Sequence, residues 1–495
     1  MLHKRYLTWF SIVIILLLAA FLRLYRINDY MAFLGDEGRD VLIVKRMIID
    51  HQFTLLGPIT SIGLMHLGPI YYYFMIPFLW VSGLHPVGPA IMVALFSVAT
   101  VALLWQFGRE FFDTKTGLIA ALLYTFSPLV LTYSHSSWNP NILPFWALLL
   151  IYSLTKAVVK REYWWLFVTG ACLGIVLQLH YVALVFILII TTILTYIHFD
   201  LPKKYLLGAV AGCILLLSPF ILFELRHDFI NTKTVFEFIV RTDDQKSFGL
   251  VSPINKYWDL TVRMFWRLIV VRSAELSIFF LITVLATCVF LLFRWPKNEP
   301  KRHVLMQLLI WYVVGIGMLS FYTGTTYDYY LMFVFPLPFL LTAIALRTFM
   351  KIAIGAVAAL AILLTIVSFQ WQLLPLHQAP NRLVAQTKEI ADFILKKTEH
   401  KPYNFALIAG KNSDHAYRYF LEIGGQPPVV IENPNDDPQR KSVTNQLFVV
   451  CEDKECKPLG HPLWEIAGFG RAEIIDEWSV GLFRVFKLVT YKSES

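Results

Sequence analysis

YLTWFSIVIILLLAAFLRLYRINDYMAFLGDEGRD, residues 6–40, joins a long apolar run to a dense group of charged side chains. An α-helix needs about 20 apolar residues to cross roughly 30 Å of hydrocarbon. Residues 6–25 therefore predict a membrane-spanning helix. The acids and the arginine of GDEGRD, residues 35–40, lie just beyond the end of that span.

Apolar runs of this length recur along most of the 495-residue chain, which is 57% hydrophobic and only 16% charged. Soluble domains carry roughly 25% charged residues, so this composition excludes a soluble globular protein. We predict an all-α polytopic membrane protein with about eleven spanning helices, because a helix satisfies its backbone polar groups without water. The predicted spans lie near residues 6–25, 87–107, 117–133, 141–159, 163–179, 181–199, 205–224, 275–293, 304–322, 330–346 and 351–373.

The charge of the short connections predicts the orientation of the chain. With a cytoplasmic N-terminus, every inner connection contains Lys or Arg, as in VKREYW and RWPKNEPKRH, which is the usual bias of cytoplasmic loops. This bias also explains the net charge of +9, which therefore does not indicate nucleic-acid binding. The threading exports a first loop (26–86) and a further loop (226–274), and it predicts a multi-pass protein of the plasma membrane.

An odd number of spans exports the C-terminal tail as well. After residue 375, helical patterns such as RLVAQTKEIADFILKK alternate with strand-like runs such as QLFVVCE. The predicted domains are therefore a transmembrane domain, residues 1–375, and a small extracytoplasmic α/β domain, residues 376–495. Cys451 and Cys456 would form a disulfide if the tail faces an oxidising compartment.

The acid pair of the first exported loop has two interpretations. Adjacent helical residues point about 100° apart, so Asp36 and Glu37 can serve different partners. One carboxylate can accept a proton from an attacking nucleophile while the other orients a substrate or a cation, and the Arg39 fork suits a phosphate. Alternatively, the two acids only stabilise the first turn of a helix through its dipole.

Other ionisable residues also have more than one interpretation. His66 precedes the Gly68–Pro69 break and could bind a metal or a phosphate, although a lone histidine usually does neither. Arg23 and Arg26 lie on the exported side against the usual charge bias, which predicts an anionic partner such as Asp36 or a phosphate. Three later arginines are expected to reach lipid phosphates from an interfacial helix, outside the active site: Arg263, Arg267 and Arg272.

Several motifs together resemble a known family. FLRLYRI, then FLGDEGR, GPIYYY and GREFFDTKTGLIAALLYTFSPLVLTYS, are similar to the integral-membrane C-type glycosyltransferases, above all the protein O-mannosyltransferase and lipid A aminoarabinose transferase group. The resemblance covers about residues 6–200, returns at YDYYLMFVFPLPFL (327–340), and is absent from the tail. It implies transfer of a hexosyl or pentosyl group, with inversion, from a polyprenyl-phosphate donor to a glycan, lipid or protein acceptor at the extracytoplasmic face.

The resemblance also implies roles for particular residues. Asp36 would be the catalytic base, Glu37 a supporting acid, and Arg39 a ligand of the lipid phosphate. Further candidates for binding the donor phosphate are His66 and Tyr329. Candidates for contacts with the substrate or acceptor are Asn139, Asn141, His180 and Asp328.

The chain departs from the family pattern at two of these positions. Relatives often carry a lysine or a charged pair just before a Pro-Pro, whereas Met65, His66 and Leu67 precede Gly68–Pro69 here, so phosphate binding at this point requires His66 to substitute. Aminoarabinose-type relatives often carry an aspartate at the start of the fourth helix, where this chain has only Asn139 and Asn141. A neutral amide cannot act as a base, so the base role falls on Asp36. A divalent metal ion remains open as a cofactor, with three candidate ligands: Glu37, His66 and His180.

Two other functions remain open. A transporter or flippase for lipid-linked glycans, without catalysis, would need ionisable groups near the middle of the membrane. The predicted spans are nearly free of charge, which favours the transferase. A non-catalytic scaffold whose tail binds partners is the third possibility.

Overall fold

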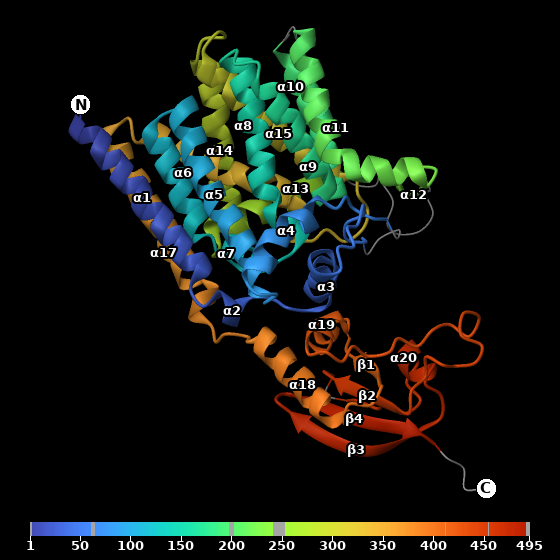
Figure 1. Cartoon of the computed structure of the whole chain (residues 1–495). Helices are drawn as coiled ribbons and strands as arrows, with labels where there is room; N and C mark the ends of the chain where they lie inside the picture. The colour runs from blue at the N-terminus through green and yellow to red at the C-terminus, as the bar shows by residue number, and fades with distance from the viewer. Residues whose placement is uncertain are drawn as a thin grey trace. The chain divides into compact units, whose positions relative to one another are not determined.

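The computed structural model describes residues 2–60, 65–197, 202–240, 253–410, 412–453 and 455–491. The chain forms two compact units (Figure 1): unit 1 comprises Met1–Tyr25, Phe53–Phe78 and Pro89–Ala379, and unit 2 comprises Arg26–Gln52, Leu79–Gly88 and Pro380–Ser495. Unit 2 thus takes in two segments of the predicted first loop besides the tail. Parts of both predicted exported loops and the end of the 181–199 span lie outside the described residues.

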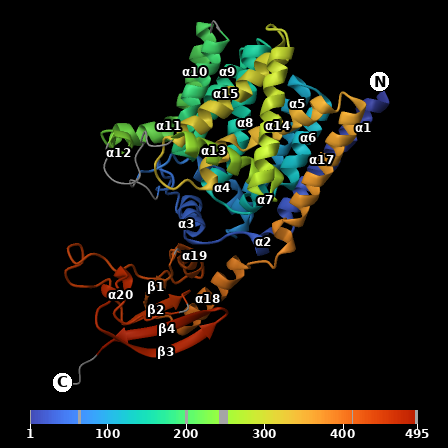
Figure 2. The ribbon, with the colours of Figure 1, turned by 180° about the vertical axis from the view of Figure 1, so that it is seen from behind.

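Unit 1 is a helical bundle in which, for example, α9 packs against both α8 and α11 (Figures 1 and 2). Its helices are α1 (Leu2–Leu24), α4 (Ile70–Val81), α5 (Val87–Phe111), α6 (Thr114–Phe126), α7 (Pro128–Ser134), α8 (Leu143–Val159), α9 (Trp165–Leu179), α10 (Val185–Tyr196), α11 (Lys203–Arg226), α12 (Ile230–Val240), α13 (Pro253–Phe265), α14 (Ala274–Arg294), α15 (Pro300–Ser320), α16 (Pro336–Phe349) and α17 (Ala353–Gln372). The short helical turns are η1 (Asn139–Ile142), η2 (Tyr181–Leu184), η3 (Trp266–Val270), η4 (Asp328–Val334) and η5 (Pro375–His377).

The polytopic all-α prediction is confirmed. Among the described residues, seven helices are long and apolar enough to cross a membrane, or nine if each of two bent pairs counts as one span. Two further predicted spans, 163–179 and 181–199, correspond to the shorter apolar helices α9 and α10. The helix is interrupted at His180, between α9 and η2, as predicted from the polar residues there.

Glycines allow the closest helix contact of unit 1. Gly170 and Gly174 lie one turn apart on α9, and a Cβ at Gly170 would meet the Ala209 carbonyl oxygen of α11 at 1.8 Å. In return, a Cβ at Gly212 would meet the Phe167 carbonyl oxygen at 2.5 Å. Small residues at this spacing let helix backbones approach closely in a membrane.

The bend of 65° between α6 and α7 explains a buried arginine. Arg23 has no exposed surface, and its guanidinium donates to the carbonyls of Tyr124 at 3.2 Å and Thr125 at 3.4 Å, and to the Ser97 hydroxyl at 2.7 Å. A cation at the C-terminal end of α6 satisfies carbonyls that the broken helix leaves open. The expectation of an anionic partner for Arg23 was therefore wrong, and Arg26 pairs with Asp29 at 2.7 Å instead.

Unit 2 contains a four-stranded sheet in the order β1 (Asn404–Ile408), β2 (Gln446–Cys451), β4 (Phe483–Thr490), β3 (Ala472–Val480). β1 and β2 are parallel, whereas β4 is antiparallel to both of its neighbours. A parallel pair needs a crossover connection, and the segment containing α19 (His415–Ile423) provides it. The other helices are α2 (Ile27–Tyr30), α3 (Gly35–Ile49), α18 (Leu383–Lys397) and α20 (Trp464–Ala467).

The predicted sheet-containing tail domain is confirmed, and its two tail cysteines are bonded. Cys451 and Cys456 form a disulfide directly after β2. An apolar core that includes Leu447, Val449 and Phe486 packs on one side of the sheet.

The acid-bearing helix α3 belongs to this unit because it packs against α19. A Cβ at Gly38 would meet the Ala416 nitrogen at 2.2 Å, and one at Gly35 would meet the Ser413 hydroxyl oxygen at 1.9 Å. Farther along α3, Lys45 reaches Glu422 of α19 at 2.9 Å. The glycines of GDEG therefore mark the face of α3 on which another backbone lies.

We expect Gly38→Ala to destabilise unit 2 by about 1–3 kcal/mol, since an added methyl group would overpack a contact made by backbone atoms. The measurement is the melting temperature of the purified protein in detergent. Gly317→Ala is the control, because a Cβ at Gly317 of α15 has no neighbouring atom within 4 Å. Equal melting temperatures for the two variants would contradict the close packing of α3 on α19.

Candidate functional site

The first turn of α3 separates the roles of the two adjacent acids. Glu37 is only 8% exposed, and its carboxylate accepts a hydrogen bond from the Leu34 backbone nitrogen at 3.1 Å. This is the return half of a capping box, which satisfies a donor at the helix start. The Asp36 side chain is 54% exposed. Of the pair, Asp36 is therefore the carboxylate open to a substrate.

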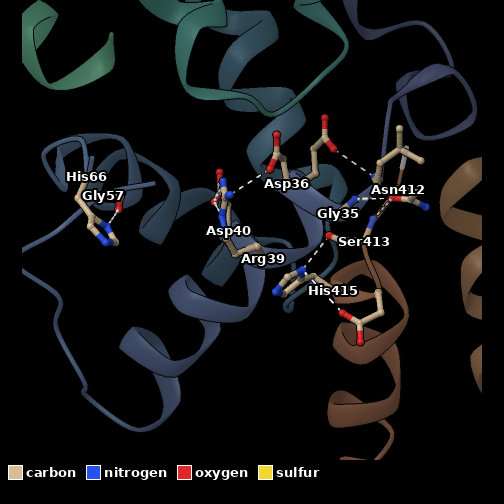
Figure 3. Close-up of polar contacts among 12 residues, drawn as sticks. Gly35, Asp36, Arg39, Asp40, Gly57, His66, Asn412, Ser413 and His415 are labelled. Atoms are coloured by element: carbon tan, nitrogen blue, oxygen red, sulfur yellow. Dashed lines mark hydrogen bonds and ion pairs between the residues drawn. The ribbon is translucent and has the colours of Figure 1, made fainter. Parts of the chain in front are cut away.

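Arg39 joins two acids of the same helix (Figure 3). Its guanidinium lies 3.0 Å from the Asp36 carboxylate and 2.8 Å from that of Asp40, whose side chain is fully buried. The helical spacing of Asp36 and Arg39 permits this contact. The pairing fixes the orientation of Asp36, and it shows that Arg39 has carboxylate partners within its own helix.

The tail contributes residues that sequence reasoning did not connect with the acids. Asn412 accepts a hydrogen bond from the Gly35 backbone nitrogen at 2.9 Å, and Ser413 and His415 are hydrogen-bonded at 2.8 Å (Figure 3). Burial lowers the pKa of His415, and the nearby Arg39 charge acts in the same direction against the opposing effect of Asp414 and Asp36. No local motif could have indicated these contacts, because they join segments far apart in the sequence.

In unit 1, the predicted candidates gather at three polar breaks between helices. The ring of Tyr329, in η4, lies 4.5 Å from the ring of Trp138 and 6.0 Å from that of His180. Asn139 donates to the carbonyl of Leu179, the neighbour of His180, at 2.6 Å. The structure thus brings Asn139, His180 and Tyr329 together, whereas Asn141 donates locally to Ser136 at 2.8 Å.

His66 belongs to a second polar group in unit 1. Its backbone nitrogen donates to the Asn231 side chain at 2.7 Å, and its carbonyl accepts from Tyr181 and from Asn231. Its imidazole Nδ1 lies 3.4 Å from the Gly57 carbonyl oxygen. Asn231 in turn is held by the buried Glu224 at the end of α11.

Arg263 of α13 and Arg267 of η3 form a charged group that sequence analysis placed outside the site. Arg267 lies 3.1 Å from Asp328, and Arg263 lies 3.7 Å from the same carboxylate and donates to the Thr326 carbonyl at 2.9 Å. The assignment of these two arginines to lipid headgroups alone was therefore incomplete, since they contact the candidate Asp328 beside Tyr329. Their spacing of four residues on one amphipathic helix was the available signal.

The described residues contain no group of three or more His, Cys, Asp or Glu side chains arranged to hold a metal ion. Among the candidate ligands, the Glu37 carboxylate caps α3, and His180 Nδ1 accepts from the Val182 nitrogen at 3.2 Å. Within the described part of the chain, the candidate ligand side chains therefore do not fit a metal site.

Comparisons with known proteins agree with this architecture. Residues 66–223 match a family model described as dolichyl-phosphate-mannose-protein mannosyltransferase. The structure of ArnT from Cupriavidus metallidurans bound to undecaprenyl phosphate is 14% identical, with a TM-score of 0.65 and coverage of 96% of this chain and 97% of that chain. No curated protein matches the sequence.

A second structural relative has the same fold over less of its length. It is the archaeal oligosaccharyltransferase AglB from Archaeoglobus fulgidus, in complex with an inhibitory peptide and a dolichol-phosphate. Its identity is 13% and its TM-score 0.52, with coverage of 90% of this chain and 69% of that chain.

These matches establish the fold of the chain. The chain shares the fold of ArnT and AglB, the fold of the integral-membrane C-type glycosyltransferases that the sequence motifs predicted. Within the class, the chain resembles the protein O-mannosyltransferase and lipid A aminoarabinose transferase group.

The ion pairs of Glu422 in α19 with Lys45 and Arg46 in α3 help to hold the two helices together, and their strength depends on pH. Burial acts to raise the pKa of Glu422, but hydrogen bonds from Lys45 and Arg46 outweigh it and lower the pKa. Above the usual pKa of glutamate, the ion pairs of Glu422 therefore contribute their full stability. This stability is lost as the pH falls through the lowered pKa that Glu422 has in the folded protein. We expect Glu422→Gln to reduce the melting temperature at pH 7, and the difference from wild type to shrink as the pH falls below the usual glutamate pKa of about 4.3.

Glu399→Gln is the matched control, because its pair with Lys401 is largely exposed and such pairs contribute little. A Glu422→Gln difference that stays constant as the pH falls well below the usual glutamate pKa would contradict the assignment.

Proposed function

We propose that this protein transfers a sugar from a polyprenyl-phosphate-linked donor to an acceptor at the extracytoplasmic face of the membrane, with inversion and with Asp36 as the base. The observation that carries the proposal is that the two adjacent acids have different environments. Glu37 is used in capping α3, whereas the Asp36 carboxylate is open and is held by Arg39 at 3.0 Å. A donor of this chemical class is supported by relatives of the same fold bound to undecaprenyl phosphate or dolichol-phosphate.

The reaction is a single displacement. The acceptor hydroxyl gives its proton to the Asp36 carboxylate while its oxygen attacks the anomeric carbon from the face opposite the phosphate. The bond between the anomeric carbon and the phosphate oxygen breaks, and the polyprenyl phosphate leaves with the electron pair. One displacement inverts the anomeric configuration, and no covalent glycosyl–enzyme intermediate is formed.

Charge on the leaving group gives Arg263 and Arg267 a role. A departing phosphate gains negative charge, and fixed guanidinium groups stabilise it in the transition state. Arg263 and Arg267 share one carboxylate, that of Asp328, so this group keeps an excess positive charge. We assign binding of the donor phosphate to these arginines, with Tyr329, the residue that follows Asp328, as a further candidate.

The orientation of the chain completes the proposal. A cytoplasmic N-terminus and exported acids follow from the basic connections predicted above.

Removal of residues 376–495 would not separate an enzyme from a scaffold, because it would also delete α19, on which α3 packs. A substitution at Asp36 separates the alternatives, since neither a scaffold nor a flippase needs a proton acceptor there.

We expect Asp36→Asn to reduce transfer by roughly 10²–10⁴-fold, the usual contribution of a general base. Cells lacking the gene should accumulate a polyprenyl-phosphate sugar, measured by mass spectrometry of lipid extracts. That lipid fraction then serves as the donor for the purified protein, with release of polyprenyl phosphate as the measured product.

Asp50→Asn is the matched control, since Asp50 ends the same helix and is exposed. Full turnover by a folded Asp36→Asn protein would remove Asp36 as the base. Movement of the lipid between leaflets without any release of polyprenyl phosphate would establish the flippase instead.

We expect Arg267→Gln to raise the donor KM by about tenfold or more, because a hydrogen bond to a charged group contributes about 1.5–3 kcal/mol. The control is Arg272→Gln, an identical change at an arginine that packs over the Phe369 ring at 5.6 Å. The same lipid fraction and product measurement apply. Equal effects of the two substitutions would argue against a specific phosphate contact at Arg267.

A further inference from the structure

The start of α3 takes its capping group from the distant tail. The N-cap residue, Leu34, makes no side-chain cap hydrogen bond, because leucine carries no acceptor. The Gly35 nitrogen instead donates to the side-chain oxygen of Asn412 at 2.9 Å, across a separation of 377 residues. Because Asp36 follows Gly35 directly, this bond acts one residue away from the proposed base.

The orientation of the Asn412 amide is set by its other contacts. Its oxygen also accepts from the Ser413 nitrogen at 2.9 Å, and its amino group donates to the two Glu452 oxygens at 3.0 and 3.1 Å. A primary amide has one accepting oxygen and one donating nitrogen, and here both ends are engaged. Neither an aspartate nor a reversed amide could make the same set of bonds.

Glu452 is itself held from two sides. Its carboxylate accepts from the Tyr417 hydroxyl at 2.7 Å, and its backbone nitrogen donates to the Ile408 carbonyl of β1 at 3.0 Å. Burial and the Glu452 charge raise the pKa of Tyr417, which keeps the hydroxyl protonated as a donor. Cys451, the preceding residue, is tied to Cys456 by the disulfide.

We propose that Asn412, oriented by Glu452, is a positioning residue that sets the direction of the Asp36 carboxylate in the transfer reaction. The inference rests on the proposed function, because it takes Asp36 as the base. The inference depends on a continuous series of hydrogen bonds that leads from Tyr417 and Glu452 through Asn412 to Gly35. A base displaced by about 1 Å loses up to about 10²-fold in rate, so the tail domain contributes to catalysis without touching the substrate.

The test is Asn412→Asp in the full-length protein, with the lipid fraction from deletion cells as the donor. This substitution keeps the oxygen that accepts from Gly35 but sets a carboxylate against the Glu452 carboxylate. We expect kcat to fall by about 10–100-fold with an unchanged donor KM. Asn435→Asp, the same exchange at an exposed position of the same unit, should leave both constants unchanged.

A double variant makes the test independent of folding losses. In N412D/E452Q, the amide introduced at position 452 donates to the carboxylate introduced at position 412, so the donor–acceptor pattern is restored with the same net charge. We expect the double variant to recover most of the wild-type kcat. No recovery, or a donor KM that changes in place of kcat, would overturn the positioning role.

The two proposals fail in different ways. If Asp36→Asn keeps wild-type turnover, the proposed function fails and this inference fails with it. If Asp36→Asn is inactive but Asn412→Asp turns over normally, the inference fails alone.

Discussion

The absence of side chains at Gly35 and Gly38 is the constraint on which the candidate site depends. Residues three positions apart share a helix face, and at both glycines a Cβ would collide with the α19 segment at 1.9–2.2 Å. Only a bare backbone can lie this close. Because the glycines turn toward the tail, Asp36 turns away from it and stays open, while Glu37 folds back to cap the helix. Packing and chemistry thus use different faces of one helical turn.

Two of the arginine–aspartate groups, each made of three side chains, have net charges of opposite sign. In unit 2, Arg39 is shared by Asp36 and Asp40, so the group keeps excess negative charge. In unit 1, Asp328 is shared by Arg263 and Arg267, so that group keeps excess positive charge. A group with more carboxylates than guanidinium groups suits acceptance of a proton, and a group with more guanidinium groups suits binding of an anion.

Local sequence patterns predicted most of the fold. Apolar length located the helices of the spans, and the polar residues around His180 located the break between α9 and η2. The acid pair was also evident, since adjacent acids beyond a span are a local signal. The tertiary contacts were not predictable. Arg23 donates to carbonyls of a helix 101–102 residues away, and no sequence pattern near Gly35 indicates its hydrogen bond to Asn412. Such contacts depend on which segments meet, and a single sequence does not record that.

The packing of α3 on α19 also determines when the acid pair can reach its final environment during synthesis of the chain. During translation, α3 leaves the ribosome when most of the chain is still unmade, and Asn412 follows 377 residues after Gly35. At 5–20 residues per second this delay is roughly 20–75 s. Until then, the helix that carries the acid pair lacks its docking partner. A nascent chain therefore waits in the bilayer without an assembled acid centre, and only a completed polypeptide acquires one.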